Sequence, residues 1–369
     1  MPALLETSSE PYHKKQTSKG KVLLTGNFEV VVTVRSEEKC RTIVKTLKNP
    51  SHRCSFAIVE DIAKEGAYDA LFQATADSGG AEKPFDYVVH TASPYQFHVE
   101  DPVKDFLDPA IKGTTGLLHS IQAHAPSVRR VVITSSSAAV IDPKSHAKVY
   151  DETHWPTVTW EEAMDPKNTY RCSKVFSEKA AWAIANATDP RPKFDLVTLN
   201  PTYNFGPIQR GLPRLAAVNA SNARIRDLVL GVHGPRGALP GLPPTAPVFT
   251  FVDVRDVALA HLRALTVPEA GGQRFYVVGA HFSNQHIAAA VARRFPQLRG
   301  PAACRHRGRG TTTCPPTSTG STTASRGGSS ALSTGGSRRA WWTRCAPCWP
   351  TRTRKGYLDH VVRHCLFGG

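Results

Sequence analysis

Short hydrophobic runs alternate with helical stretches from Lys21 to Pro201. The runs are continuous in Val, Ile, Leu and Phe, which is typical of strands buried on both faces. We predict strands at 22–25, 29–34, 54–60, 85–92, 129–136 and 194–201. Helices are predicted at 36–47, 67–75, 105–123 and 168–187. This alternation predicts an α/β fold, a Rossmann-type doubly wound parallel sheet.

The pattern changes after Pro201. Residues 206–248 are rich in Gly and Pro, which suits the loops of a smaller substrate-side lobe. Beyond them we predict a strand and helix within 249–265, with Asp253 or Asp256 as the helix cap. A strand at 274–280 and a capped helix at 283–295 follow.

These changes divide the chain into four parts. We expect a disordered arm at 1–20, a dinucleotide-binding domain at 21–200, and a smaller lobe at 201–299 that interleaves with the sheet. Residues 300–369 form a low-complexity basic tail rich in Ser and Thr, which buries too little apolar area to offset its ordering entropy. The abrupt junction near residue 300 indicates a reading-frame change, and a genuine disordered tail is the alternative.

The tail supplies +10 of the net charge of +16, because it holds 11 lysines and arginines against one acidic residue. A basic tail without a recognition fold does not predict specific nucleic-acid binding. No apolar stretch is long enough to cross a membrane, and residues 1–20 lack the apolar core of a signal peptide. We therefore expect a cytoplasmic protein without a membrane partner. Cys345 and Cys348 have metal-site spacing but lack a second pair, so no metal is predicted.

Candidate chemistry lies in "TSSSAAV" and "YRCSK", which place Ser136, Tyr170 and Lys174 in order along the chain. A free tyrosine has a pKa of about 10 and is a poor acid at neutral pH without help. Lys174 stands at i+4 and shares a helix face with Tyr170, so its charge favours the phenolate. We predict Tyr170 as proton donor, Lys174 as the residue that tunes it, and Ser136 as the holder of a carbonyl oxygen.

Seven ordered motifs carry a family resemblance between Lys21 and Gly300. They are "VVVTVRSEEK", "FDYVVHTASP", "DPAIKGTTGLL", "RRVVITSSSAAV", "YRCSK", "LNPTYNFGP" and "FVDVRDVALAH". The chain resembles the extended short-chain dehydrogenase/reductases, in particular the dihydroflavonol reductase-like aldehyde and ketone reductases that include methylglyoxal reductase. The resemblance implies NADPH-dependent reduction of a small-molecule carbonyl substrate to an alcohol.

The cofactor is expected to be NADP(H). Arg35 follows the second strand, where an arginine suits a 2′-phosphate, and Lys39 adds a second positive charge one turn later. By resemblance, Lys174 also binds the nicotinamide ribose. The resemblance implies further cofactor contacts from Gly26, Asp61, Ile62, Thr91, Ala92, Ser93, Tyr170, Pro201 and Tyr203.

The glycine-rich turn and first helix of such enzymes, roughly 17 residues by resemblance, are missing after Gly26. Those glycines and the helix N-terminus cradle the pyrophosphate. Parallel neighbours need a crossover of about a dozen residues, whereas Gly26 and Asn27 favour a hairpin. The first strand must therefore pair antiparallel, leave the sheet or merge with the next strand. The hypothesis that follows is that this chain binds NADPH very weakly or not at all.

Two alternatives remain beside the reductase. A non-catalytic nucleotide sensor or scaffold would keep the fold without turnover, although the intact Ser136, Tyr170 and Lys174 argue against long decay. A nucleotide-sugar epimerase or dehydratase of the same superfamily would need a sugar-nucleotide site in the second lobe, where we identify no such residues.

Overall fold

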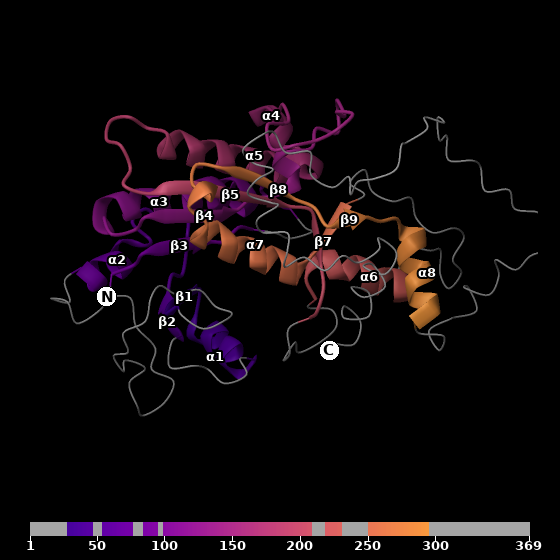
Figure 1. Cartoon of the computed structure of the whole chain (residues 1–369), viewed down its shortest axis with the longest axis horizontal. Coiled ribbons are helices and arrows are strands. Elements are labelled where there is room, and N and C mark those ends of the chain that lie inside the picture. Colours follow the sequence, from indigo (N-terminus) through magenta and orange to yellow (C-terminus); the bar gives the residue numbers. More distant parts are fainter. Residues whose placement is uncertain are drawn as a thin grey trace, which may run out of the picture.

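A computed structural model of the chain describes residues 28–46, 54–76, 84–94, 99–208, 218–230 and 250–294 (Figure 1). Within these ranges, strands alternate with helices as the hydrophobic pattern predicts. The predicted strand at 22–25, the arm at 1–20 and the tail at 300–369 lie outside the described residues.

The main sheet has four strands in the order β3-β4-β5-β8, and every neighbouring pair is parallel. Its strands are Tyr87–His90, Arg130–Thr134, Asp195–Pro201 and Arg274–Val277. The parallel sheet predicted from the sequence is confirmed. Because the strands run the same way, the carboxyl ends of β4 and β5 meet at one edge of the sheet, with Thr134 opposite Leu199.

Helices cover both faces of this sheet, with α5 (Pro166–Ala185) on one side and α7 (Val254–Thr266) on the other (Figure 1). Side chains alternate accordingly, since Val132 packs in the α7 cluster and Val131 packs against α2 (Asp69–Ala76) and α3 (Asp108–His124). Because these strands are buried on both faces, they appear in the sequence as continuous hydrophobic runs.

Strands β1 (Val30–Val34) and β2 (Cys54–Ile58) form a separate two-stranded parallel sheet beside α1 (Glu37–Thr46). Among the described residues neither strand pairs with β3, and Figure 1 shows the pair set off from the main sheet. An edge-to-face contact between Phe28 and Tyr87, with ring centroids 6.2 Å apart, joins the two. The segment before Phe28 lies outside the description, so its pairing stays a prediction.

A third, three-stranded sheet lies at the other end of the main sheet. It contains β6 (Tyr203–Phe205), β7 (Thr250–Asp253) and β9 (Ala280–His281), and α6 (Ala220–Leu230) and α8 (Asn284–Arg294) accompany it. An aromatic cluster of Phe205, Phe251 and Phe282 fills its centre. These elements follow residue 201, but β8 returns to the main sheet, and the boundary of the lobe stays a prediction.

Helix caps refine the predicted boundaries. Asp253 is the residue that caps α7, because its carboxylate accepts a hydrogen bond from the Arg255 backbone amide at 2.8 Å. Helix α5 begins at Pro166, two residues earlier than predicted, since Asp165 caps it and proline suits the first helical position.

The predicted helix at 105–123 is continuous but begins with a π-helical turn, Val103–Leu107. Pro109 has no amide hydrogen for the Asp105 carbonyl, so the ordinary α-helical bond is not made there. In the π-helical turn the Asp108 amide donates to the Val103 carbonyl, five residues earlier. The remaining short helices are Ser137–Ala139 (η2), Trp160–Ala163 (α4) and Pro268–Ala270 (η4).

Arg130 ties the amino ends of β4 and β5 to the end of α7. Its guanidinium makes two bonds to the Asp195 carboxylate, at 2.6 and 2.8 Å. It also donates to the backbone carbonyls of Ala264, Val267 and Pro268. One side chain therefore satisfies the last carbonyls of a helix and a carboxylate on the next strand.

We predict that Arg130→Ala lowers the free energy of unfolding by about 3 kcal/mol, because it leaves the Asp195 carboxylate and the backbone carbonyls without their hydrogen-bond donor. Urea denaturation measures the change. Arg129→Ala is the matched control, since the neighbouring Arg129 side chain is 65% exposed and its ion pair with Asp86 lies at the surface. That variant is expected to lose less than about 1 kcal/mol. Equal losses for the two variants would contradict the assignment.

Candidate active site

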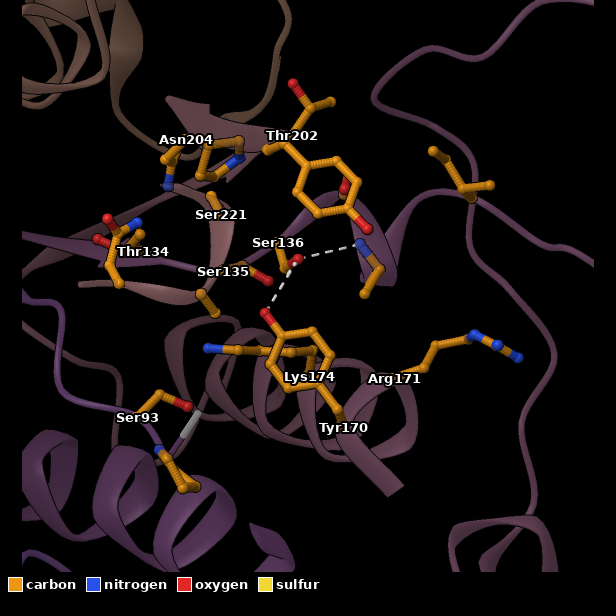
Figure 2. Close-up of a pocket in the computed structure, with 18 of the residues that line it drawn as sticks. Ser93, Thr134, Ser135, Ser136, Tyr170, Arg171, Lys174, Thr202, Asn204 and Ser221 are labelled. Carbon is orange, nitrogen blue, oxygen red and sulfur yellow. Dashed lines mark hydrogen bonds between the residues drawn. The ribbon is translucent and has the colours of Figure 1, made fainter. Parts of the chain in front are cut away.

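A cavity of about 520 Å³ opens at the carboxyl ends of β4 and β5 (Figure 2). In open α/β sheets this edge is where ligands bind. The wall is rich in hydroxyl groups. It is formed by Thr91, Ser93, Pro94, Thr134, Ser135, Ser136, Ser137, Ala138, Ile141, Pro143, Lys167, Tyr170, Arg171, Lys174, Pro201, Thr202, Tyr203, Asn204, Asn219, Ala220 and Ser221.

Ser136 leaves the end of β4 in extended conformation and caps the short helix η2. Its Oγ accepts a hydrogen bond from the Ala138 amide at 3.1 Å. The Tyr170 hydroxyl donates to the same oxygen at 3.4 Å. Figure 2 shows Tyr170 and Lys174 of α5 on the side of the cavity opposite Thr202 and Asn204, with Ser136 between them. The structure therefore brings together the three residues predicted to be catalytic.

Lys174 lies one turn after Tyr170, with its Nζ 5.9 Å from the centroid of the tyrosine ring. Its side chain is buried, and burial lowers the pKa of the ammonium group from 10.5 to about 8. The Glu178 carboxylate, one turn further along the helix, opposes that shift. Phe106 packs edge-on against the Tyr170 ring, with centroids 6.3 Å apart, and limits where the ring can move.

His90 at the end of β3 is a second buried titratable group beside Lys174. Burial lowers its pKa to about 4, and the positive charge of Lys174 contributes to the shift. The imidazole is therefore neutral at physiological pH. Its Nε2 has no hydrogen-bond partner among the described residues.

The predicted cofactor residues fall into two groups. Thr91, Ser93, Pro201 and Tyr203 line the cavity with the catalytic residues, whereas Ala92 does not. Arg35, Lys39, Asp61 and Ile62 also lie outside the cavity wall; Arg35, Lys39 and Asp61 are exposed. Ile62 packs against Gly113 of α3, where an added Cβ would approach its side chain to 2.9 Å. Gly26 lies outside the described residues.

The structure adds functional candidates that we did not predict. Thr202 and Asn204 line the cavity, and their side-chain oxygens have no partner among the described residues. Glu178 lies behind the cavity, and the sequence held a signal for it, since Tyr170, Lys174 and Glu178 recur every four residues on one helix face. Nothing local marks Arg274, which reaches Glu178 from a strand 96 positions later.

Among the described residues, no group of His, Cys, Asp or Glu is arranged to hold a metal ion. Nor does any helix in those ranges have the length and apolar character needed to span a membrane. Cys40, Cys54 and Cys172 are free and buried.

A parallel sheet covered on both faces, with a hydroxyl-lined cavity at its carboxyl edge, defines a Rossmann-like α/β protein of the dinucleotide-binding class. Residues 32–279 match the NAD dependent epimerase/dehydratase family, and the chain belongs to that family.

Relatives in this family are reductases by name. The chain is 52% identical over 277 residues to a ketoreductase, azaE, of Aspergillus niger. The matched region covers 75% of this chain and 78% of the relative. The chain is 37% identical over 285 residues to the NADPH-dependent methylglyoxal reductase GRE2 of Saccharomyces cerevisiae, spanning 76% and 79%. Among solved structures, Gre2 of Candida albicans in complex with NADPH superposes with a TM-score of 0.66 at 33% identity, covering 74% of this chain and 78% of that one.

The residues present fit the nicotinamide half of such a cofactor. The cavity volume falls within the range of small-molecule sites, roughly 300–1,000 Å³. Its wall offers hydroxyls, the Lys174 ammonium and the unpartnered oxygens of Thr202 and Asn204, which are the partners that a ribose and a carboxamide require. The glycine-rich turn that would meet the pyrophosphate is missing from the sequence after Gly26, and Gly26 itself lies outside the described residues.

Because its ammonium group is buried, Lys174 is expected to lower the free energy of unfolding. The unfolded chain holds the proton up to pH 10.5 and the folded chain only to about 8, so stability rises with pH between these values. We predict that Lys174→Met raises the free energy of unfolding at pH 7 by on the order of 3 kcal/mol, since it removes a buried charge. Denaturation at several pH values measures this. Lys167→Met, at an exposed position on the same wall, should change nothing, and a less stable Lys174→Met chain would contradict the prediction.

Proposed function

We propose that this protein reduces an aldehyde or ketone to an alcohol with NADPH. The observation that carries the proposal is the hydrogen bond between Tyr170 and Ser136 at the cavity wall, with the buried Lys174 beside the tyrosine ring. The names of the Aspergillus and Saccharomyces relatives support the same reaction and the same cofactor. The substrate is a small carbonyl compound that reaches the Ser136 hydroxyl.

Reduction of the carbonyl group adds a hydride to its carbon and a proton to its oxygen. Bound NADPH supplies the hydride that forms the new C–H bond. As the carbonyl π electrons move to oxygen, Tyr170 gives its phenolic proton to that oxygen, and the product is a neutral alcohol. Ser136 donates its hydroxyl hydrogen to the same oxygen and holds it within reach of Tyr170. In the structure the Tyr170 hydroxyl donates to Ser136 Oγ at 3.4 Å, a spacing that lets one carbonyl oxygen bound between them accept a hydrogen bond from each.

Lys174 acts on the charge that remains after the proton transfer. The tyrosinate is stabilised by a nearby cation, because an opposite charge favours the ionised form of an acid. A low-dielectric setting strengthens this interaction, and Lys174 is buried. By family resemblance Lys174 also binds the nicotinamide ribose, and Arg35 binds the 2′-phosphate that distinguishes NADPH.

Tyr170→Phe, made in a chain with the glycine turn and helix restored after Gly26, tests the proton donor. We expect turnover of a panel of aldehydes and ketones, methylglyoxal included, to fall by about 100-fold or more, because the ring remains and the proton is lost. NADPH binding should change less than about twofold. Tyr68→Phe is the control, since Tyr68 is buried in the α2 cluster away from the cavity. Turnover that survives Tyr170→Phe would overturn the assignment, and binding without turnover in the unaltered chain would favour the nucleotide sensor.

The missing glycine turn generates a separate prediction about affinity. We expect very weak NADPH binding by the chain in a fluorescence titration. An otherwise identical chain with a Gly-x-x-Gly-x-x-Gly turn and helix inserted after Gly26 should bind at least about tenfold more tightly, a gain of about 1.4 kcal/mol. An insert of equal length with alanine at the three glycine positions is the control. Tight binding by the chain without an insert would refute the hypothesis.

A further inference from the structure

A buried carboxylate lies directly behind the cavity. Glu178 is 1% exposed, and its two oxygens accept four hydrogen bonds from three strands. Those donors are Ser135 Oγ at 2.5 Å, Asn200 Nδ2 at 2.7 Å, Thr198 Oγ1 at 2.8 Å and Arg274 Nε at 2.7 Å. A carboxylate has about four acceptor positions, and here all of them are filled.

Arg274 extends this group toward the serine turn. Its Nη1 donates to the carbonyls of Glu152 and His154, and its Nη2 donates to the carbonyl of Ala139. The guanidinium stacks on Trp155 at 3.6 Å from the ring centroid. Because the side chain is 7% exposed, it is held as firmly as the carboxylate that it pairs with.

These contacts anchor the backbone on both sides of Ser136. Asn200 Nδ2, bound to Glu178, also donates to the Ser136 carbonyl at 3.1 Å. Ser135 is held by its hydroxyl, and Ala139 ends the short helix that Ser136 caps. The position of the Ser136 hydroxyl is thus set by a network that does not itself enter the cavity, apart from Ser135.

Glu178 also acts on Lys174 along the helix. The two residues are one turn apart, and the carboxylate raises the pKa of an ammonium group that burial lowers. The titratable groups that face Lys174 are Tyr170 and Glu178 on its own helix and His90 on β3, which is neutral at physiological pH. Glu178 therefore supplies the negative charge that supports the protonated lysine.

We propose that Glu178 and Arg274 are positioning residues of this site: the pair fixes Ser136 at hydrogen-bond distance from Tyr170, and Glu178 places a buried carboxylate one helical turn from Lys174. The catalytic part of this inference rests on the proposed function, while the effect on Lys174 does not. The pair reaches the reacting atoms through Ser136 and Lys174.

The first test titrates Lys174 directly. The purified full chain is labelled with limiting acetic anhydride at a series of pH values, and mass spectrometry follows acetylation at Lys174. We expect the midpoint near pH 8 to fall by about one unit in Glu178→Gln, because the supporting anion is lost. An unchanged midpoint would overturn the inference, and this measurement needs neither cofactor nor turnover.

Two further variants separate positioning from folding. Asp195→Asn is the control, because it removes the carboxylate partner of another buried arginine, Arg130, at the opposite ends of β4 and β5. This variant should leave the pH midpoint of Lys174 acetylation unchanged. Glu178→Gln combined with Arg274→Met removes both members of the buried ion pair, so Arg274 is not left without its carboxylate, and this variant is expected to fold even if the single variant does not. The midpoint should fall in this double variant also. If Asp195→Asn shifted it equally, the effect would be structural and the inference would fail.

Turnover gives the second readout. We expect Glu178→Gln to lower kcat about tenfold, to move the basic limb of the pH profile to lower pH, and to change the KM for the carbonyl compound less than about threefold. An unchanged kcat and pH profile would overturn the positioning role. If neither the unaltered chain nor the chain with the inserted glycine turn reduces any carbonyl compound at saturating NADPH, the proposed function fails, and the Lys174 titration alone then decides whether Glu178 supports the lysine.

Discussion

The architecture of this site depends on the four hydrogen bonds that the Glu178 carboxylate accepts. The carboxylate joins α5 to β4, β5 and β8, so one side chain fixes the helix that carries Tyr170 and Lys174 against the strands that carry Ser136. Burying a carboxylate is costly unless every acceptor position is filled. Here each position is filled by a donor from the sheet or the turn that follows β4. These four directional hydrogen bonds fix the position of α5 relative to the sheet more closely than packing alone would.

The two ends of β4 and β5 serve different purposes. At the amino ends, Arg130 satisfies Asp195 and backbone carbonyls at the end of α7. At the carboxyl ends, polar groups face a cavity, and Lys174 is held buried with a lowered pKa. Stability and chemistry are therefore separated along the same strands, as is usual for parallel sheets. A lysine that destabilises the fold is retained where its charge is useful.

The fold was largely predictable because its signals are local. Strands buried on both faces produce continuous Val, Ile and Leu runs, and caps such as Asp253 mark where helices begin. The π-helical turn before Asp108 was not predicted, since the residue pattern there is the same as that of an ordinary α-helix. The catalytic trio was also predictable, because Tyr170 and Lys174 share a helix face and Ser136 ends a strand beside it.

What the sequence by itself determined is the class of fold and the family, and it predicted the reacting side chains, since each depends on short-range spacing. Only the tertiary structure decided which groups support them. Arg274 meets Glu178 across 96 positions of sequence, and Thr202 and Asn204 face the cavity from a strand far from Tyr170 along the chain. Such contacts depend on the parallel stacking of distant strands, and that stacking is set by the packing of the whole sheet rather than by any local pattern.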